Sequence, residues 1–230
     1  MPGRMYKFPK PQEFLRGVEA YRKNEKRDSI YKVASFLIEK LFSEDENRKN
    51  LSLIADAVGT LLLGWNSPFY RHGRPDFDLL EEVIDKYYQK FLMLRRKSLL
   101  NYNVSDYNQF FVPDCFSIRD MFLDFLEATK MKKGSSFAYS PVAAVKALHM
   151  LAPSFFPLWD DKIAQAYGCP LETPNTKIEI RERNADNYRV FMKIQKAFLV
   201  QVKAWDIPEN LKTLKAIDEF NYSKYTKGWI

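Results

Sequence analysis

One lysine of this 230-residue chain stands in surroundings that favour amine chemistry. Lys146 lies within Pro141–Trp159 (PVAAVKALHMLAPSFFPLW), where only Lys146, His149 and Ser154 are polar. Apolar residues on both flanks predict a helix that is buried on most sides, and burial disfavours the charged form of a lysine. Because a neutral amine attacks electrophilic carbon, Lys146 is a candidate nucleophile. The alternative is a structural lysine that reaches solvent or an acid from the core.

Three further polar residues lie close to Lys146 in the sequence. His149 follows it by three residues, a spacing that places both side chains on one helix face; a hydrogen-bonded core histidine is the alternative. Asp160 is expected to cap the next helix, a role that stabilises a protein by about 0.5–2 kcal/mol. A capping carboxylate is held rigidly, so Asp160 is also a candidate catalytic residue beside Lys146. Asp161 is explained by the helix dipole alone.

The elements that must position these residues are predicted to be helices, because apolar residues recur with helical spacing in nearly every segment. Strand patterns are confined to Phe110–Val112 and Lys177–Ile180. A helix that begins after Ser117 is expected to end at Lys130–Gly134, where cations suit its last turn. The predicted fold class is all-α. Further helices are expected over residues 13–26, 29–42, 51–65, 77–100, 140–152 and 209–222, with others that start at Asp160 and surround residues 188–205.

Composition narrows the class of protein. The chain is 46% hydrophobic and 28% charged, which is typical of a globular protein rather than a disordered one. No run of about 18 apolar residues is present, so no membrane span is expected. Two cysteines, Cys115 and Cys169, and two distant histidines, His72 and His149, predict neither a disulfide framework nor a metal site. We therefore expect an intracellular protein without a cofactor.

The net charge of +7 permits an anionic partner such as nucleic acid, although solvated lysines explain the same charge. Two groups of residues are candidates for phosphate contacts. Lys132, Lys133, Gly134 and Ser135 form one group, and Arg71 and Arg74 lie in a Gly/Pro loop that forms the other.

Two segments around the lysine also carry a family resemblance. Lys146–Pro153, followed by Phe156–Ala164, resembles the lysine-to-aspartate segment of the helix-hairpin-helix DNA glycosylase superfamily. It is most similar to the branch that contains the 8-oxoguanine DNA glycosylases. Asp160 and Ile163 match the family's aspartate and the apolar residue three positions after it. Upstream, Leu61–Asn66 resembles the buried helix end that opens the glycosylase domain.

The resemblance implies a helical DNA glycosylase-like fold and roles for individual residues. Lys146 would attack the anomeric carbon of a damaged nucleotide and form a Schiff base, while Asp160 would stabilise the developing oxocarbenium charge. The base would have to be flipped out of the stack, into a pocket formed by His149, Phe137, Tyr139 and Trp159. The implied organisation is N-terminal helices in residues 1–50, a glycosylase-like core in 51–168, and helices in 169–230 that complete the same domain.

One departure from the family pattern leaves a second function open. The family's hairpin carries glycines whose amides hold a phosphate, whereas Ser135–Val142 contains none. This favours a non-catalytic module that binds nucleic acid or a protein on the same scaffold. A small-molecule enzyme that uses His149 and Asp160 is a third possibility. The first hypothesis is an N-glycosylase that acts on a modified base, with or without lyase activity; the sequence leaves the base, the choice of DNA or RNA, and the oligomeric state open.

Overall fold

The structure is a computed structural model that describes residues 7–44, 50–101, 118–133, 135–173 and 176–230. Helices dominate these ranges, which confirms the predicted all-α class, and none of them is long and apolar enough to cross a membrane. In chain order the elements are α1 Pro11–Asn24, α2 Asp28–Ser43, α3 Leu51–Trp65, η1 Tyr70–His72, α4 Phe77–Arg95, η2 Leu99–Asn101, α5 Ile118–Ala128, β1 Met131–Lys133, β2 Ser136–Ala138, α6 Pro141–Leu151, α7 Asp161–Ala166, α8 Ile178–Lys203, η4 Glu209–Leu211, α9 Leu214–Asn221 and η5 Tyr222–Lys227.

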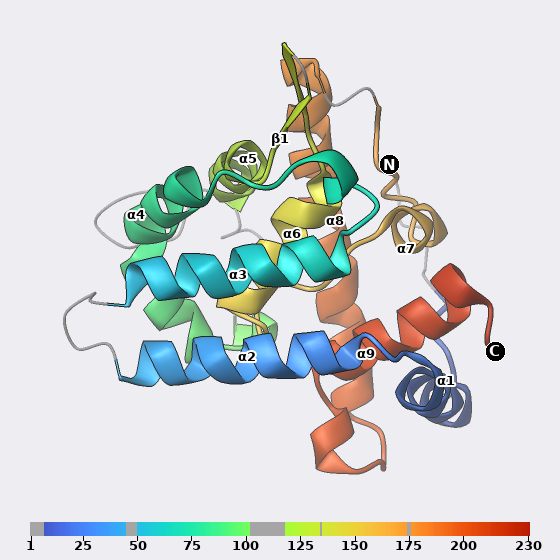
Figure 1. Cartoon of the computed structure of the whole chain (residues 1–230). Helices are drawn as coiled ribbons and strands as arrows, with labels where there is room; N and C mark the ends of the chain where they lie inside the picture. The colour runs from blue at the N-terminus through green and yellow to red at the C-terminus, as the bar shows by residue number, and fades with distance from the viewer. Residues whose placement is uncertain (1–6, 45–49, 102–117, 134, 174–175) are drawn as a thin grey trace.

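Helix α6 lies at the centre of the molecule, as its apolar flanks predict. The Ser140 side chain caps it by accepting a hydrogen bond from the Ala143 amide, and Pro141 occupies its first turn. Nine of its eleven residues are buried. Helices α2, α3 and α5 pack against it, and Figure 1 shows α2 and α3 side by side in front of it. Lys146 and Val142 are the two α6 residues that keep partial exposure.

The first helix packs against the last elements of the chain on one side of the molecule. Helix α1 packs against α9 and η5, and α7 packs against η5 (Figure 1). Gly17 of α1 makes this close approach possible, since a Cβ atom there would lie 2.6 Å from the Phe220 ring. One buried core runs through residues of all three predicted segments, 1–50, 51–168 and 169–230.

Besides the segment after α5, three predicted elements differ from the structure. Lys177–Ile180 is not a strand: Lys177 precedes α8 and the two isoleucines belong to its first turn, because the helical pattern downstream extends back to them. The helix predicted over residues 209–222 is divided into η4 and α9, since Thr213 is extended and caps α9. Helix α4 ends at Arg95 rather than at residue 100. The strand predicted at 110–112 and the cap at Ser117 lie outside the described residues.

The segment after α5 is a β-hairpin rather than the end of that helix. Helix α5 ends at Ala128, and Met131 pairs with Ala138 in an antiparallel ladder. Met131 is buried against Gly73, where a Cβ atom would lie 2.6 Å from the methionine side chain. Burial of Met131 therefore fixes an alternating pattern that leaves Lys132 exposed.

Candidate active site around Lys146

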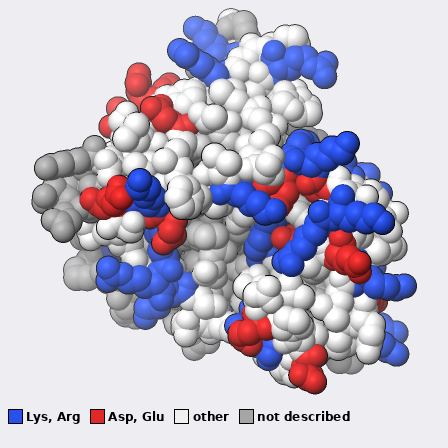
Figure 2. All heavy atoms as spheres, turned by 60° about the horizontal axis from the view of Figure 1, so that its bottom comes forward, with Lys and Arg blue, Asp and Glu red and all other residues white. Residues whose placement is uncertain are grey.

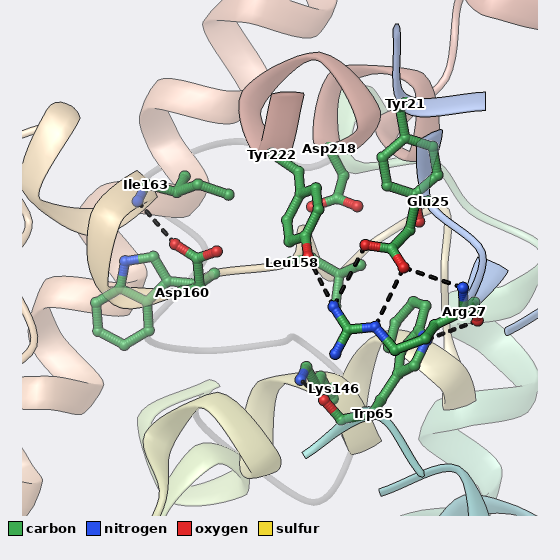
Figure 3. Close-up of a pocket in the computed structure, with 11 residues that line it drawn as sticks. Tyr21, Glu25, Arg27, Trp65, Lys146, Leu158, Asp160, Ile163, Asp218 and Tyr222 are labelled. Carbon is green, nitrogen blue, oxygen red and sulfur yellow. Dashed lines mark hydrogen bonds and ion pairs between the residues drawn. The ribbon is translucent and has the colours of Figure 1, made fainter. Parts of the chain in front are cut away.

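A cavity of about 90 Å³ lies next to α6, between segments from both ends of the chain (Figure 3). Its charged lining consists of Glu25, Arg27, Lys146, Asp160 and Asp218. Aromatic rings form much of the remaining wall, from Tyr21, Trp65, Trp159 and Tyr222. Lys146 and Asp160, the two residues predicted to act together, thus line one cavity.

The end of α3 holds the Lys146 side chain in place. Its amine donates a hydrogen bond of 2.8 Å to the Trp65 carbonyl oxygen, and its nitrogen lies 3.4 Å from Oδ1 of Asn66. The Asn66 amide nitrogen in turn donates to Oγ of Ser140, 3.2 Å away, at the start of α6. The segment that resembles the glycosylase helix end therefore touches the candidate nucleophile.

Lys146 is enclosed without a close counter-ion. Within the described ranges no carboxylate forms an ion pair with its amine, although Asp160 and Asp218 line the same cavity. Burial, followed by the charge of Arg27, lowers the Lys146 pKa to about 8 against the opposing attraction of Asp160 and Asp218. On that basis about one amine in ten is neutral at pH 7, and a neutral amine is what nucleophilic attack requires.

Asp160 is held by both of its oxygens. Oδ1 accepts a 2.8 Å hydrogen bond from the Ile163 amide, which confirms the predicted cap of α7. Oδ2 accepts a 2.6 Å hydrogen bond from the Thr226 hydroxyl, a contact across 66 residues that the local sequence did not indicate. Asp161 is exposed and accepts a hydrogen bond from Gln165 on its own helix. The Asp160 carboxylate is therefore fixed in place at the wall of the cavity.

Asp218 is the main residue of the cavity that the sequence did not indicate. It lies on α9, and burial raises its pKa to about 6, against the attraction of Lys215 and with a further contribution from Asp160. A carboxyl group with this pKa exchanges a proton near neutral pH. Its position in the helix predicted over residues 209–222, far from Lys146 in the sequence, gave no signal for this role.

A second cation faces the cavity from the turn between α1 and α2. The Arg27 guanidinium bonds both oxygens of Glu25, at 3.1 and 3.3 Å, and donates to the Tyr222 hydroxyl at 2.8 Å. Burial raises the Glu25 pKa, but hydrogen bonds from Arg27 outweigh it and hold the value at about 2. Figure 3 shows one edge of the guanidinium directed toward Lys146. Through its contacts with Glu25 and Tyr222, Arg27 thus connects the turn between α1 and α2 to η5.

The four residues predicted to form a base pocket are separated in the structure. Trp159 lines the cavity; its ring packs against Tyr188 and Phe191, and its buried Nε1 has no hydrogen-bond partner in the described part of the chain. His149 does not line the cavity. Phe137 is 42% exposed on β2, and Tyr139 stacks on Arg181.

His149 corresponds to the alternative given for it, a hydrogen-bonded core histidine. One ring nitrogen lies 3.0 Å from the Tyr31 hydroxyl and the other 2.7 Å from the Phe156 carbonyl oxygen. Complete burial lowers its pKa to about 4, so the ring is neutral at pH 7.

Part of the predicted phosphate-binding set does gather in a second depression. Arg74 and Lys132 line it together with Phe137, between the loop after η1 and the hairpin. Asp56, Asp76 and Asp78 line it as well, so its charge is mixed. Arg71 and Ser135 are exposed to solvent but do not line this depression. Gly134 and the side chain of Lys133 lie outside the described residues.

The face displayed in Figure 2 carries no uniformly positive patch. Lys and Arg side chains there lie beside Asp and Glu side chains in most clusters. In the ranges that the structure describes, His, Cys, Asp and Glu do not gather in a group of three able to hold a metal ion. The net charge is therefore weaker support for a nucleic-acid partner than the cavity is for amine chemistry.

No protein-family model, curated protein or solved structure matches the chain.

Proposed function

We propose that the protein is a DNA glycosylase-like enzyme that uses the Lys146 amine to cleave the N-glycosidic bond of a damaged or modified nucleotide. The observation that carries the proposal is the shared cavity: a half-buried lysine of lowered pKa and a rigidly held aspartate line it between aromatic rings. The resemblance of Lys146–Ala164 to the lysine-to-aspartate segment of the glycosylases supports the same assignment.

The chemistry follows from the groups in the cavity. The neutral Lys146 amine attacks the anomeric carbon, and the bond from that carbon to the base breaks with its electron pair on the base nitrogen. That nitrogen takes up a proton, and Asp160 stabilises the positive charge that develops on the sugar. Loss of a proton from the new ammonium and opening of the sugar ring give the Schiff base. Asp218 is placed to exchange one of these protons.

The volume of the cavity adds a steric requirement. At about 90 Å³ it is smaller than the usual ligand pockets of roughly 300–1,000 Å³. Side chains at its mouth therefore have to move before a flipped base enters.

Borohydride trapping tests the proposal. Oligonucleotides that carry an abasic site, 8-oxoguanine, uracil or no lesion, in single and double strands, are incubated with wild type and with Lys146→Ala. We expect a covalent complex on at least one modified strand, lost in the variant while its circular dichroism spectrum stays helical. Trapping that persists in Lys146→Ala, or the absence of both trapping and free base, contradicts the proposal.

A non-catalytic binding module is the second candidate. It is favoured by the depression that Arg74, Lys132 and exposed Phe137 line, and by the absence of glycine from Ser135–Val142. For such a module, oligonucleotide binding weakens in Arg74→Ala and Lys132→Ala, and no base is released from any strand. Lys146→Ala then leaves binding unchanged, which separates the two candidates.

A further inference from the structure

We propose that Arg27 is a positioning residue: the turn between α1 and α2 and the C-terminal element η5 hold its guanidinium across the cavity so that its charge acts on the Lys146 amine. The purpose of this arrangement rests on the proposed function, whereas its physical effect on Lys146 does not. Arg27 contacts no reacting atom and is therefore not assigned a catalytic role.

The geometry holds the guanidinium in one place. Glu25 accepts three hydrogen bonds from Arg27: one from its backbone amide at 3.0 Å, one from Nε and one from Nη2. The Tyr222 hydroxyl lies 2.8 Å from Nη2 on the far side. Two segments about 195 residues apart thus clamp one cation, and Figure 3 shows the remaining edge of that cation directed toward Lys146.

The charges around the Lys146 amine show why the position of the Arg27 guanidinium affects it. The titratable groups that line the cavity with Lys146 come from α1, the turn after it, α7 and the C-terminal elements: Tyr21, Glu25, Arg27, Asp160, Asp218 and Tyr222. Two of the carboxylates, Asp160 and Asp218, favour the protonated amine. Arg27 is the cation that opposes them, and it acts in the same direction as burial. Its removal leaves the acids to dominate, so the amine retains its proton to higher pH.

The same contacts would exist if Arg27 only joined the turn between α1 and α2 to η5. The experiment must therefore distinguish an effect of its charge on the Lys146 amine from an effect on access to the cavity. Competitive labelling of lysines with a small acylating reagent across pH, read by mass spectrometry of the Lys146 peptide, gives two quantities. The midpoint of the curve reports the pKa of the amine. The plateau at high pH reports how freely the reagent reaches it.

Arg27→Gln and Arg27→Lys are compared with wild type in this assay. We expect the midpoint for Lys146 to rise by about half to one pH unit in Arg27→Gln, which means roughly three- to tenfold less labelling at pH 7 relative to its plateau. Arg27→Lys restores a cation and brings the midpoint back toward wild type. Arg183→Gln is the matched control, because Arg183 also pairs with a glutamate, Glu172, on the surface but does not line the cavity.

The outcomes divide cleanly. A raised midpoint in Arg27→Gln that returns in Arg27→Lys supports the inference, even if wild type traps no oligonucleotide and the proposed function fails. A changed plateau with an unchanged midpoint overturns it, because Arg27 then only closes the cavity. If Arg27→Gln does not fold, Tyr222→Phe loosens the guanidinium without removing the ring; a smaller rise in midpoint supports the inference and no rise overturns it.

Discussion

Two lysines of the protein lie against the same indole ring in opposite surroundings. The Lys146 amine lies 5.7 Å from the centre of the Trp65 ring, and that of Lys215 lies 5.9 Å from it. Lys215 is surrounded by acids: its amine is 3.6 Å from Asp28, 3.6 Å from Asp218 and 3.8 Å from Glu219. Lys146 instead donates to a backbone carbonyl and has no such ion pair in the described ranges.

The difference shows that neighbouring charges, and not burial alone, decide whether a lysine is suited to nucleophilic chemistry. A lysine surrounded by three carboxylates has a structural role, because its positive charge offsets their negative charges. A lysine that burial and a second cation disfavour in its charged form is the one suited to nucleophilic chemistry. Asp218 contacts the first lysine and lines the cavity of the second, so the two sites share one acid.

The largest expected effect concerns the stability of the two sites. Lys215→Met leaves the buried Asp218 without an ion pair, although Asp28 keeps Lys32 and Glu219 keeps Arg22. It should reduce the free energy of unfolding by about 3–5 kcal/mol. Lys146→Met loses the hydrogen bond to Trp65 and should cost about 1 kcal/mol. Urea denaturation at pH 7.5 measures both. Equal losses would mean that the two lysines are both structural.

Acid pH should destabilise the protein through His149, the buried base that shares a helix with Lys146. Its pKa is about 4 in the fold and near 6.5 in the unfolded chain, so the unfolded state binds more protons below pH 6.5. Stability is fully present above pH 6.5 and falls by about 3 kcal/mol as the pH drops to 4. His149→Phe should remove most of this slope in urea titrations, while His72→Ala should keep it. A slope that survives His149→Phe would assign the effect to carboxyl groups whose pKa the fold lowers, such as Glu25 and Asp28.

A smaller effect separates capping from chemistry at Asp160. Asparagine is as good a cap as aspartate, so Asp160→Asn should change the free energy of unfolding by less than about 0.5 kcal/mol, whereas Asp160→Ala should cost roughly 1 kcal/mol. Both variants remove the carboxylate and should reduce trapping at least tenfold. If Asp160→Asn trapped as well as wild type, the aspartate would be a cap and nothing more.

Local patterns predicted much of the fold and the two central residues of the cavity. The caps at Ser140 and Asp160, helix α3 and the burial of α6 follow from signals within a few residues, and all agree with the structure. The hairpin after α5 was missed, because Met131 is buried by Gly73, far away in the sequence. Lysines at the end of a helix and lysines on an exposed strand give the same pattern in the sequence.

The rest of the site depends on contacts between distant segments. Arg27, Asp218 and Tyr222 enter the cavity because α1 packs against α9 and η5, which no local motif encodes. The aromatics chosen near Lys146 in the sequence, Phe137 and Tyr139, point elsewhere for the same reason. Proximity along the chain therefore predicted that Lys146 and Asp160 lie at one site, but not the walls of the cavity around them.

The most direct test identifies which lysine reacts. Wild type is incubated with an abasic-site oligonucleotide and borohydride, digested with protease and nuclease, and the deoxyribose-derived adduct is located by mass spectrometry. Peptides that contain Lys146 and Lys215 are quantified from the same sample. An adduct on Lys146, with Lys215 unmodified, is the predicted result. An adduct on Lys215 or spread over surface lysines would contradict the assignment of Lys146 as the nucleophile.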